Sequence, residues 1–149
     1  MEKALAVAKE FYDEYFSCFG KKMDEMKMHK LMYFAQRESL MLSGEVLFQE
    51  DFFGWKYGPI LKSVRTQYME EQPFQDVEGC VCQATRDLVK AVMDRYAKLS
   101  SWRLSSLSHN EFSWKCSRKG LDASDHGDVK VEVSAMKVDA ARELSQRKS

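Results

Sequence analysis

The side chains with the clearest catalytic potential in this sequence are three histidines and four cysteines. Cys116 lies seven residues after His109, and a thiol beside an imidazole is the pair that cysteine-based nucleophilic catalysis requires. Such a pair also needs a third group that orients the histidine, and nothing in the sequence positions either residue for attack. We therefore interpret His109 as a hydrogen-bonding residue at the end of a helix, His29 as a residue at the core boundary and His126 as solvated.

Metal and cofactor sites are not indicated either. Cys80 and Cys82 are separated by one residue, whereas zinc-binding cysteines are usually about two to four residues apart. The sequence has no glycine-rich phosphate loop, and its scattered acidic residues form no evident acid–base couple. It therefore predicts no catalytic residue, no metal, no cofactor and a protein that is not an enzyme. A small-molecule enzyme is the least favoured alternative, because its pocket would need convergent polar groups that the sequence does not display.

The most distinctive local feature is the aromatic segment Trp55-Lys56-Tyr57-Gly58-Pro59. One interpretation is a structural corner, in which Trp55 and Tyr57 pack and Gly58-Pro59 turns the chain into a helix. The other is an interface anchor, because Trp and Tyr are enriched among the residues that dominate binding energies. The residues alone favour the corner about two to one, and the two roles can coexist.

Composition favours a folded protein with a protein partner. The chain has 149 residues, of which 44% are hydrophobic, and its 23 basic residues balance its 23 acidic ones. DNA-binding domains usually carry a basic excess, because neutralised phosphates supply much of their affinity. The first residues resemble no signal peptide and no apolar run could span a membrane, so we expect a cytoplasmic protein with reduced cysteines.

The hydrophobic pattern predicts a mainly α fold, a single compact helical domain over residues 1–149 around a central hydrophobic helix. Two short β segments are also expected, at about residues 45–50 and 129–133. The expected helices cover about residues 3–18, 24–43, 59–70, 83–97 and 102–107, with a last helix from Ser134 to about Leu144. Residues 72–82 read as the main exposed loop.

Several of these segments, taken in order, resemble the Panacea domain. They are Lys30–Gln36 (KLMYFAQ), Leu47–Glu50 (LFQE), Trp55–Ile60 (WKYGPI) and Leu104–Glu111 (LSSLSHNE) with Trp114 downstream. The spacing holds from about Met23 to the last helix, and four ordered motifs are far more specific than any one of them. The helix after Pro59 and the Phe112-Ser113 pair depart from the usual pattern of the family.

The resemblance implies an antitoxin that directly binds and neutralises a small cognate protein toxin. The family includes phage-associated proteins and an antitoxin that delivers its toxin to a bacterial ATP-dependent protease, so a role as a proteolytic adaptor is also implied. A nucleic-acid-binding regulator of its own operon is the alternative. Its candidate basic clusters are Lys21, Lys22, Lys27 and Lys30, and Arg142, Arg147 and Lys148, which fit solvated faces and a frayed terminus better.

Partner binding is expected at Trp55, Tyr57, His109, Glu111 and Trp114. Both motifs mix aromatic and polar groups, as binding anchors do, and we expect them to lie together on one face of the domain. Tyr57 and Glu111 are expected to be exposed, because each carries a polar end. Simple packing in the core is about as favoured as an interface role for Trp55 and Trp114.

Overall fold

The computed structural model describes residues 1–148. Within them the chain forms seven helices and one two-stranded sheet. The elements in order are α1 Ala4–Phe19, α2 Glu25–Ser43, β1 Phe53–Trp55, β2 Gly58–Ile60, α3 Lys62–Tyr68, α4 Gln83–Tyr96, α5 Ser101–His109, α6 Phe112–Ser117 and α7 Val133–Lys148. The prediction of a mainly α fold is confirmed.

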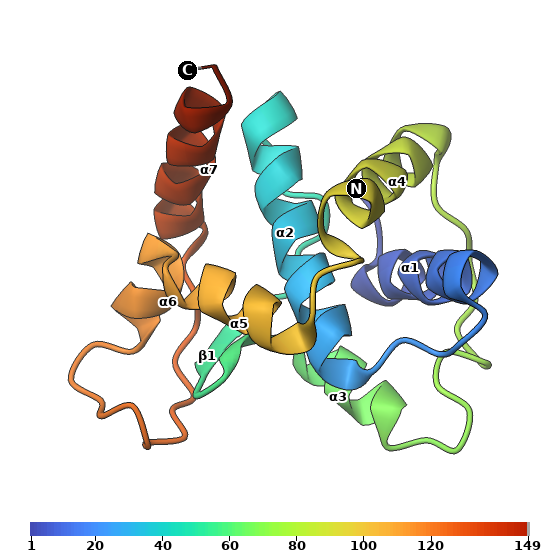
Figure 1. The fold of residues 1–149 in the computed structure, drawn as a ribbon, viewed down its shortest axis with the longest axis horizontal. Helices are drawn as coiled ribbons and strands as arrows, with labels where there is room; N and C mark the ends of the chain where they lie inside the picture. Colours follow the sequence, from blue (N-terminus) through green and yellow to red (C-terminus); the bar gives the residue numbers. More distant parts are fainter. Residues whose placement is uncertain (149) are drawn as a thin grey trace.

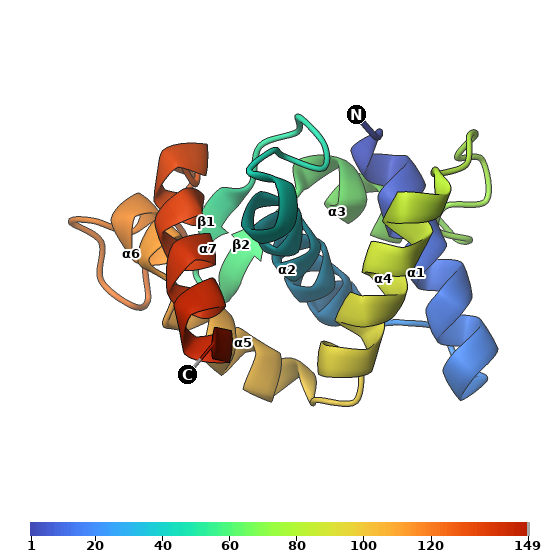
Figure 2. The same cartoon turned by 90° about the horizontal axis from the view of Figure 1, so that it is seen from above.

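Helix α2 is the centre of the molecule. It contacts α1, α3, α4, α5, α7 and β2. Figures 1 and 2 show α1 and α4 on one flank of α2 and α6 and α7 on the other, with α5 crossing below. Every residue from Lys27 to Leu40 is buried, as expected for a helix that is covered on all sides.

Local signals in the sequence define both ends of α2. The Asp24 side chain accepts a hydrogen bond of 2.8 Å from the backbone N–H of Lys27, which satisfies a donor that the first turn leaves free. At the other end Gly44 adopts a left-handed conformation, with φ of 76°, and its N–H bonds the Leu40 carbonyl. Gly20 ends α1 in the same way.

The small β element is present, but not at the residues that the sequence indicated. The strands are β1 and β2, which pair antiparallel across a two-residue turn, with Phe53 opposite Ile60. Residues 45–50 form only an isolated bridge between Phe48 and Glu2, because the Gln36 side chain occupies the N–H groups of Leu47 and Phe48.

The predicted strand at 129–133 is also wrong. Gly54 N–H donates to the Val129 carbonyl and Val131 N–H donates to the Phe52 carbonyl, both at 2.8 Å. The only bridge recorded for this segment joins Lys130 to Phe53, so the segment lies along β1 without extending the sheet. Val133 already belongs to α7.

Two helix boundaries also differ from expectation. Pro59 pairs with Gly54 in the hairpin, so α3 starts three residues later than predicted, at Lys62. Helix α7 begins at Val133, which places Ser134 inside the helix instead of at its cap, and it runs on to Lys148. Its last turn is held by an ion pair between Arg147 and Glu38 of α2, a contact that no local sequence pattern predicts.

The buried apolar residues form one continuous cluster to which α1–α5 and α7 contribute. Leu31, Tyr33 and Phe34 of the central helix all lie in it, with exposed fractions of 0%, 0% and 1%. Phe34 stacks on Tyr96 of α4 with ring centroids 4.4 Å apart and an interplanar angle of 12°. The central helix is thereby fixed against the α1–α4 flank.

Candidate functional site

The hairpin β1–β2 is attached to the body of the protein through the backbone carbonyl of Tyr57. The buried Lys30 ammonium donates a hydrogen bond to this oxygen, and the Ser105 hydroxyl of α5 donates a second one at 3.4 Å. Two neighbouring elements therefore hold the tip of the hairpin. Lys30 is 1% exposed, and burial lowers its pKa to about 8.

Gly58 makes this approach possible. Its φ is 125°, a conformation that side-chain-bearing residues rarely adopt. A Cβ at this position would lie 2.3 Å from Lys30 Nζ and 2.8 Å from Ser108 Oγ. The glycine of the Trp55–Pro59 motif is therefore needed both for its backbone angle and for the space that Lys30 fills.

Three of the predicted site residues meet beside the hairpin. The His109 ring stacks on Trp114, with centroids 4.2 Å apart and an interplanar angle of 8°, and the Trp114 indole donates to the Trp55 carbonyl at 2.9 Å. All three side chains are half-buried. His109 does end a helix, as expected; burial and the nearby Lys30 ammonium lower the pKa of its imidazole.

Tyr57 completes this group at the surface. Its side chain is 48% exposed, as predicted, and it meets the ring of Trp102 edge-on at a centroid distance of 6.1 Å. Trp102, in α5, is itself 67% exposed. We call the surface formed by Trp55, Tyr57, Trp102, His109 and Trp114 the hairpin face.

Glu111 does not lie on this surface, and the expectation that it is exposed was wrong. Its side chain is 13% exposed and forms a 2.6 Å ion pair with Arg37 of α2. It also accepts a hydrogen bond of 3.2 Å from the Tyr33 hydroxyl. A carboxylate at the start of α6 is drawn inward because the buried Arg37 guanidinium needs a counter-charge.

Asp139 of α7 organises the same interior. Its two carboxylate oxygens accept hydrogen bonds from the backbone N–H groups of Phe112 and Ser113, at 2.7 and 2.8 Å, and so cap α6 from another helix. The Tyr33 hydroxyl lies 2.7 Å from the Ser113 hydroxyl and 3.3 Å from Asp139. Burial, Glu111 and Asp139 together raise the pKa of Tyr33 well above its ordinary value.

The segment that follows α6 folds around one arginine. The Arg118 guanidinium donates to four backbone carbonyls, those of Gly54, Asp122, Asp125 and His126. This arrangement ties residues 118–128 to the hairpin. His126, expected to be solvated, is exposed but lies with its ring centroid 4.4 Å from that of Trp55.

A cleft of about 640 Å³ opens between these parts, and we call it the hairpin cleft. Its walls are the first turns of α2, the hairpin, α3 and the tip of the 118–128 segment. The lining side chains include Met26, Lys30, Trp55, Lys56, Tyr57 and Arg65. His29 lies at its base; its Nδ1 accepts from Leu61 N–H at 3.2 Å, which leaves Nε2 as the donor to Glu25 at 3.0 Å.

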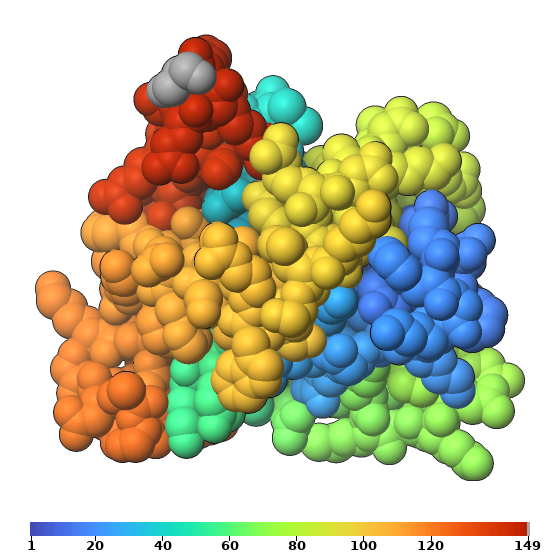
Figure 3. All heavy atoms as spheres, viewed as in Figure 1, coloured from blue at the N-terminus to red at the C-terminus, as the bar shows by residue number. Residues whose placement is uncertain are grey.

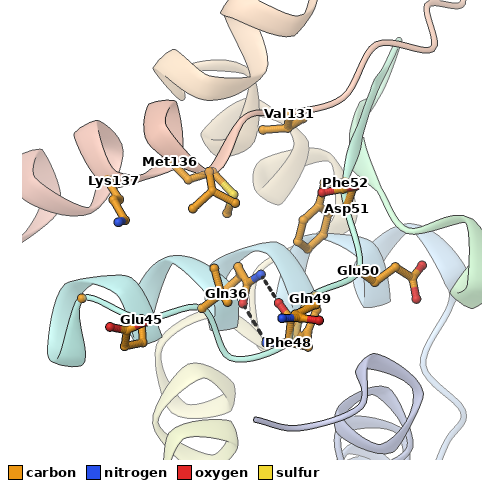
Figure 4. Close-up of a pocket in the computed structure, with 13 residues that line it drawn as sticks. Gln36, Glu45, Phe48, Gln49, Glu50, Asp51, Phe52, Val131, Met136 and Lys137 are labelled. Carbon is orange, nitrogen blue, oxygen red and sulfur yellow. Dashed lines mark hydrogen bonds between the residues drawn. The ribbon is translucent and has the colours of Figure 1, made fainter.

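A second cavity of about 490 Å³ lies between α2, residues 45–52 and α7. Figure 4 shows Gln36 on its wall, bonded to the Phe48 backbone. The amide of Gln36 is satisfied by the backbone of residues 47–48, so its role is to fix that segment. This cavity offers less for binding than the hairpin cleft, since its buried polar group is already engaged.

The basic clusters considered for nucleic acid are only partly exposed, since Lys21, Lys22, Arg142 and Lys148 lie at the surface and the other members do not. Lys27 is 8% exposed and donates to the Ala97 carbonyl at 2.8 Å, while Lys30 lies in the interior. Arg147 is paired with Glu38 and Glu143. Lys27 therefore contributes nothing to a surface for phosphates, and Lys30 borders the hairpin cleft instead of an exposed basic surface.

Sequence reasoning missed Lys30, Trp102, Arg118 and Asp139 as residues that shape this region. Lys30 stood within an apolar run, which is a signal that a lysine is buried. Trp102 lies in a polar segment just after Ser100, the N-cap of α5, and a polar segment is a signal of exposure. Arg118 and Asp139 carried no local signal, because their partners lie on other elements.

Comparison with protein families places the chain. Residues 28–115 match the family described as antitoxin SocA-like, Panacea domain, which spans more than half of the sequence. The chain belongs to this family, and the match covers most of α2, the hairpin, α3, α4, α5 and most of α6. No curated protein and no solved structure resembles the chain closely enough to count as a match. None of the helices in residues 1–148 is long and apolar enough to cross a membrane.

Proposed function

We propose that the protein is an antitoxin that directly binds and neutralises a small cognate protein toxin in the cytoplasm. The observation that carries the proposal is membership of the antitoxin SocA-like Panacea family over residues 28–115. That range holds both the central helix and the hairpin face, so the part of the chain that defines the family also contains the candidate surface. No catalytic step is assigned to it.

We place the toxin on the hairpin face. Tyr57 and Trp102 offer exposed aromatic area, and Trp55 adds a half-buried ring beside them. Rigid, amphipathic rings bind with little loss of conformational freedom, which is why they dominate interface energies. The stacked His109 and Trp114 support the hairpin, whereas Glu111 acts from the interior by holding α6 against Arg37.

Fixed geometry supports this placement. The hairpin backbone is bonded by Lys30 and Ser105 at Tyr57, by Trp114 at Trp55 and by Arg118 at Gly54. A surface whose backbone is held before binding loses less entropy when a partner docks. Contacts from α2, α5, α6 and Arg118 thus hold the backbone that carries the aromatic rings.

The test is co-expression with the protein encoded by the neighbouring reading frame. We expect growth to be rescued and the two proteins to purify together. Tyr57→Ala should weaken both effects, whereas Phe16→Ala should not, because Phe16 is equally exposed, at 52%, but lies on α1 away from the hairpin. Failure of both rescue and co-purification with the unmodified chain would exclude the antitoxin function.

The same experiment separates blocking from delivery to a protease. Direct neutralisation requires only the complex, so rescue should persist in cells that lack the bacterial ATP-dependent protease. Loss of rescue in those cells, with the complex still formed, would identify a proteolytic adaptor instead.

A double variant tests where the toxin docks. Normal neutralisation by a folded Tyr57→Ala, Glu111→Ala double variant would mean that the toxin docks elsewhere than on the hairpin face.

A further inference from the structure

The hairpin cleft carries a charge imbalance that the chain as a whole does not. Three basic residues line it, Lys30, Lys56 and Arg65, against one acidic residue, Glu25. The full sequence has equal numbers of basic and acidic residues. A locally positive concave surface on a neutral protein concentrates negative ligands, because low-dielectric walls focus its field.

The negative charges near the cleft are already engaged. Glu25 accepts from Arg65 at 2.9 Å and from His29 at 3.0 Å. Asp128, at the edge of the cleft, accepts from Lys62 at 3.1 Å and from the Trp55 indole at 3.0 Å. Neither carboxylate is left to neutralise Lys30 or Lys56.

Lys30 and Lys56 have no carboxylate partner within residues 1–148. Lys30 is 1% exposed and its one recorded acceptor is the Tyr57 carbonyl, while Lys56 lies over the Tyr57 ring at 5.1 Å. A buried ammonium without a counter-ion is costly, and an incoming carboxylate would relieve that cost. Two unpaired cations therefore border the same opening.

Aromatic rings lie beside these cations. Tyr57 lines the cleft and meets the exposed ring of Trp102, which adjoins the lining, edge-on. Trp55 also lines the cleft, with Arg65 over its ring at 5.4 Å. Figure 3 shows the hairpin reaching the surface below α5, between the orange segment after α6 and the blue start of α2. Apolar and cationic contacts are thus available together, which suits a peptide better than a free ion.

We propose that the hairpin cleft binds an acidic segment of the toxin, with a large apolar side chain against Tyr57 and Trp102 and carboxylates facing Lys56 and Lys30. This inference rests on the proposed function and names the chemistry of the partner segment. An acidic strand or loop of the partner complements the charge, and its apolar anchor complements the rings.

The test uses synthetic peptides and the full chain, so it does not depend on the toxin. The probe is a capped seven-residue peptide with a central tryptophan flanked by glutamates. Matched peptides carry glutamine or lysine in place of glutamate. We expect the glutamate peptide to bind about tenfold more tightly than the glutamine peptide in fluorescence anisotropy, because paired charges add affinity at a desolvated site.

Charge reversal supplies the internal control. Lys56→Glu should lower the affinity for the glutamate peptide by about tenfold or more and raise the affinity for the lysine peptide, because like charges in contact are costly. Lys90→Glu makes the same change on exposed α4, on the other flank of α2, and should alter neither affinity. Lys30→Met should also weaken the glutamate peptide; if that variant fails to fold, Lys56→Glu alone decides.

Three results would overturn the inference. They are equal binding of the glutamate and glutamine peptides, unchanged binding by Lys56→Glu, and displacement of the glutamate peptide by a single-stranded 12-nucleotide DNA at lower concentration than by free peptide. The last result would assign the cleft to nucleic acid. Toxin neutralisation that persists while the peptides fail would reject this cleft chemistry and leave the antitoxin function standing.

Discussion

Lys30 shows at the scale of one residue how this protein uses a charge in its interior. Its ammonium group is buried at the base of the hairpin cleft and donates to the Tyr57 carbonyl. Burial favours the neutral amine, and this lowers the pKa of Lys30 from 10.5 to about 8. The unfolded chain keeps the ordinary value, so the two states hold different numbers of protons between these pH values.

This difference predicts a pH dependence of stability. Between pH 8 and 10.5 the unfolded chain binds the proton that folded Lys30 has released, so the contribution of Lys30 to the free energy of unfolding rises with pH by up to about 3 kcal/mol. This gain in the free energy of unfolding is fully present above pH 10.5 and is lost as the pH falls through 8. Urea unfolding of the parent and of Lys30→Met at pH 7.5, 8.5 and 9.5 measures it.

The difference between these two proteins isolates Lys30 from the tyrosines, whose raised pKa values act in the opposite direction. The free energy of unfolding of the parent should rise relative to that of Lys30→Met as the pH rises. Lys90→Met, on an exposed face of α4, should show no such gain. Parallel pH profiles for the parent and Lys30→Met would show that the buried lysine keeps an ordinary pKa.

Phe34 supports the second prediction at this scale. It is 1% exposed, stacks on Tyr96 and lies under the Arg37 guanidinium at 4.8 Å. Phe34→Ala should lower the free energy of unfolding by about 3–5 kcal/mol, because it removes a large buried ring and leaves a cavity. Chemical denaturation measures the change; a variant that melts like the parent but loses toxin binding would make Phe34 an interface residue.

At the scale of elements, the hairpin β1–β2 is the part whose geometry depends most on its neighbours. A hairpin of two three-residue strands joined by a two-residue turn is not stable alone. Here Lys30, Ser105, Trp114 and Arg118 each bond its backbone, and residues 129–131 lie along β1. The aromatic surface is therefore held by contacts from four other segments.

Gly58 gives the corresponding prediction. Gly58→Ala should destabilise the fold by more than Gly79→Ala, because both positions have positive φ, 125° and 98°, but only the Cβ at 58 meets other atoms within 4 Å. We expect the strain common to both to be on the order of 1–3 kcal/mol, with a further loss at Gly58 from the displaced Lys30. Equal losses in urea unfolding would mean that Lys30 moves aside freely.

At the scale of the whole molecule, the two flanks of α2 share one core. α1 and α4 pack on one side and α7 with α6 on the other, and the buried residues of both sides join through α2. We propose that residues 1–149 form a single domain. Within residues 1–148 neither flank has a hydrophobic core that is independent of α2, so the two flanks should unfold together.

Cooperative unfolding tests this proposal directly. The three tryptophans, Trp55, Trp102 and Trp114, all lie on the hairpin side, whereas α1 and α4 contain none. Tryptophan fluorescence should therefore report one side, and far-ultraviolet circular dichroism every helix. Both should give coincident single transitions in urea. A fluorescence transition that precedes the loss of helix would divide the molecule into two units.

The sequence by itself determined the elements whose causes are local. Apolar spacing indicated α1, α2 and α4, Asp24 capped α2, and Gly20 and Gly44 ended α1 and α2. The dense run from Lys30 to Gln36 identified the central helix, and ordered motifs indicated the family that the match over residues 28–115 established. Each of these depends on neighbours within a few turns of the same segment.

The tertiary structure decided the features that depend on distant partners. Gln36 occupies the N–H groups of residues 47–48, so the apolar segment there forms no strand; Asp139 caps α6 from α7; and Arg37 draws Glu111 inward. The hairpin face forms because the buried Lys30 holds the hairpin at Tyr57. The physical reason is that a buried polar group must find a partner wherever the fold places one, and sequence spacing does not encode that position.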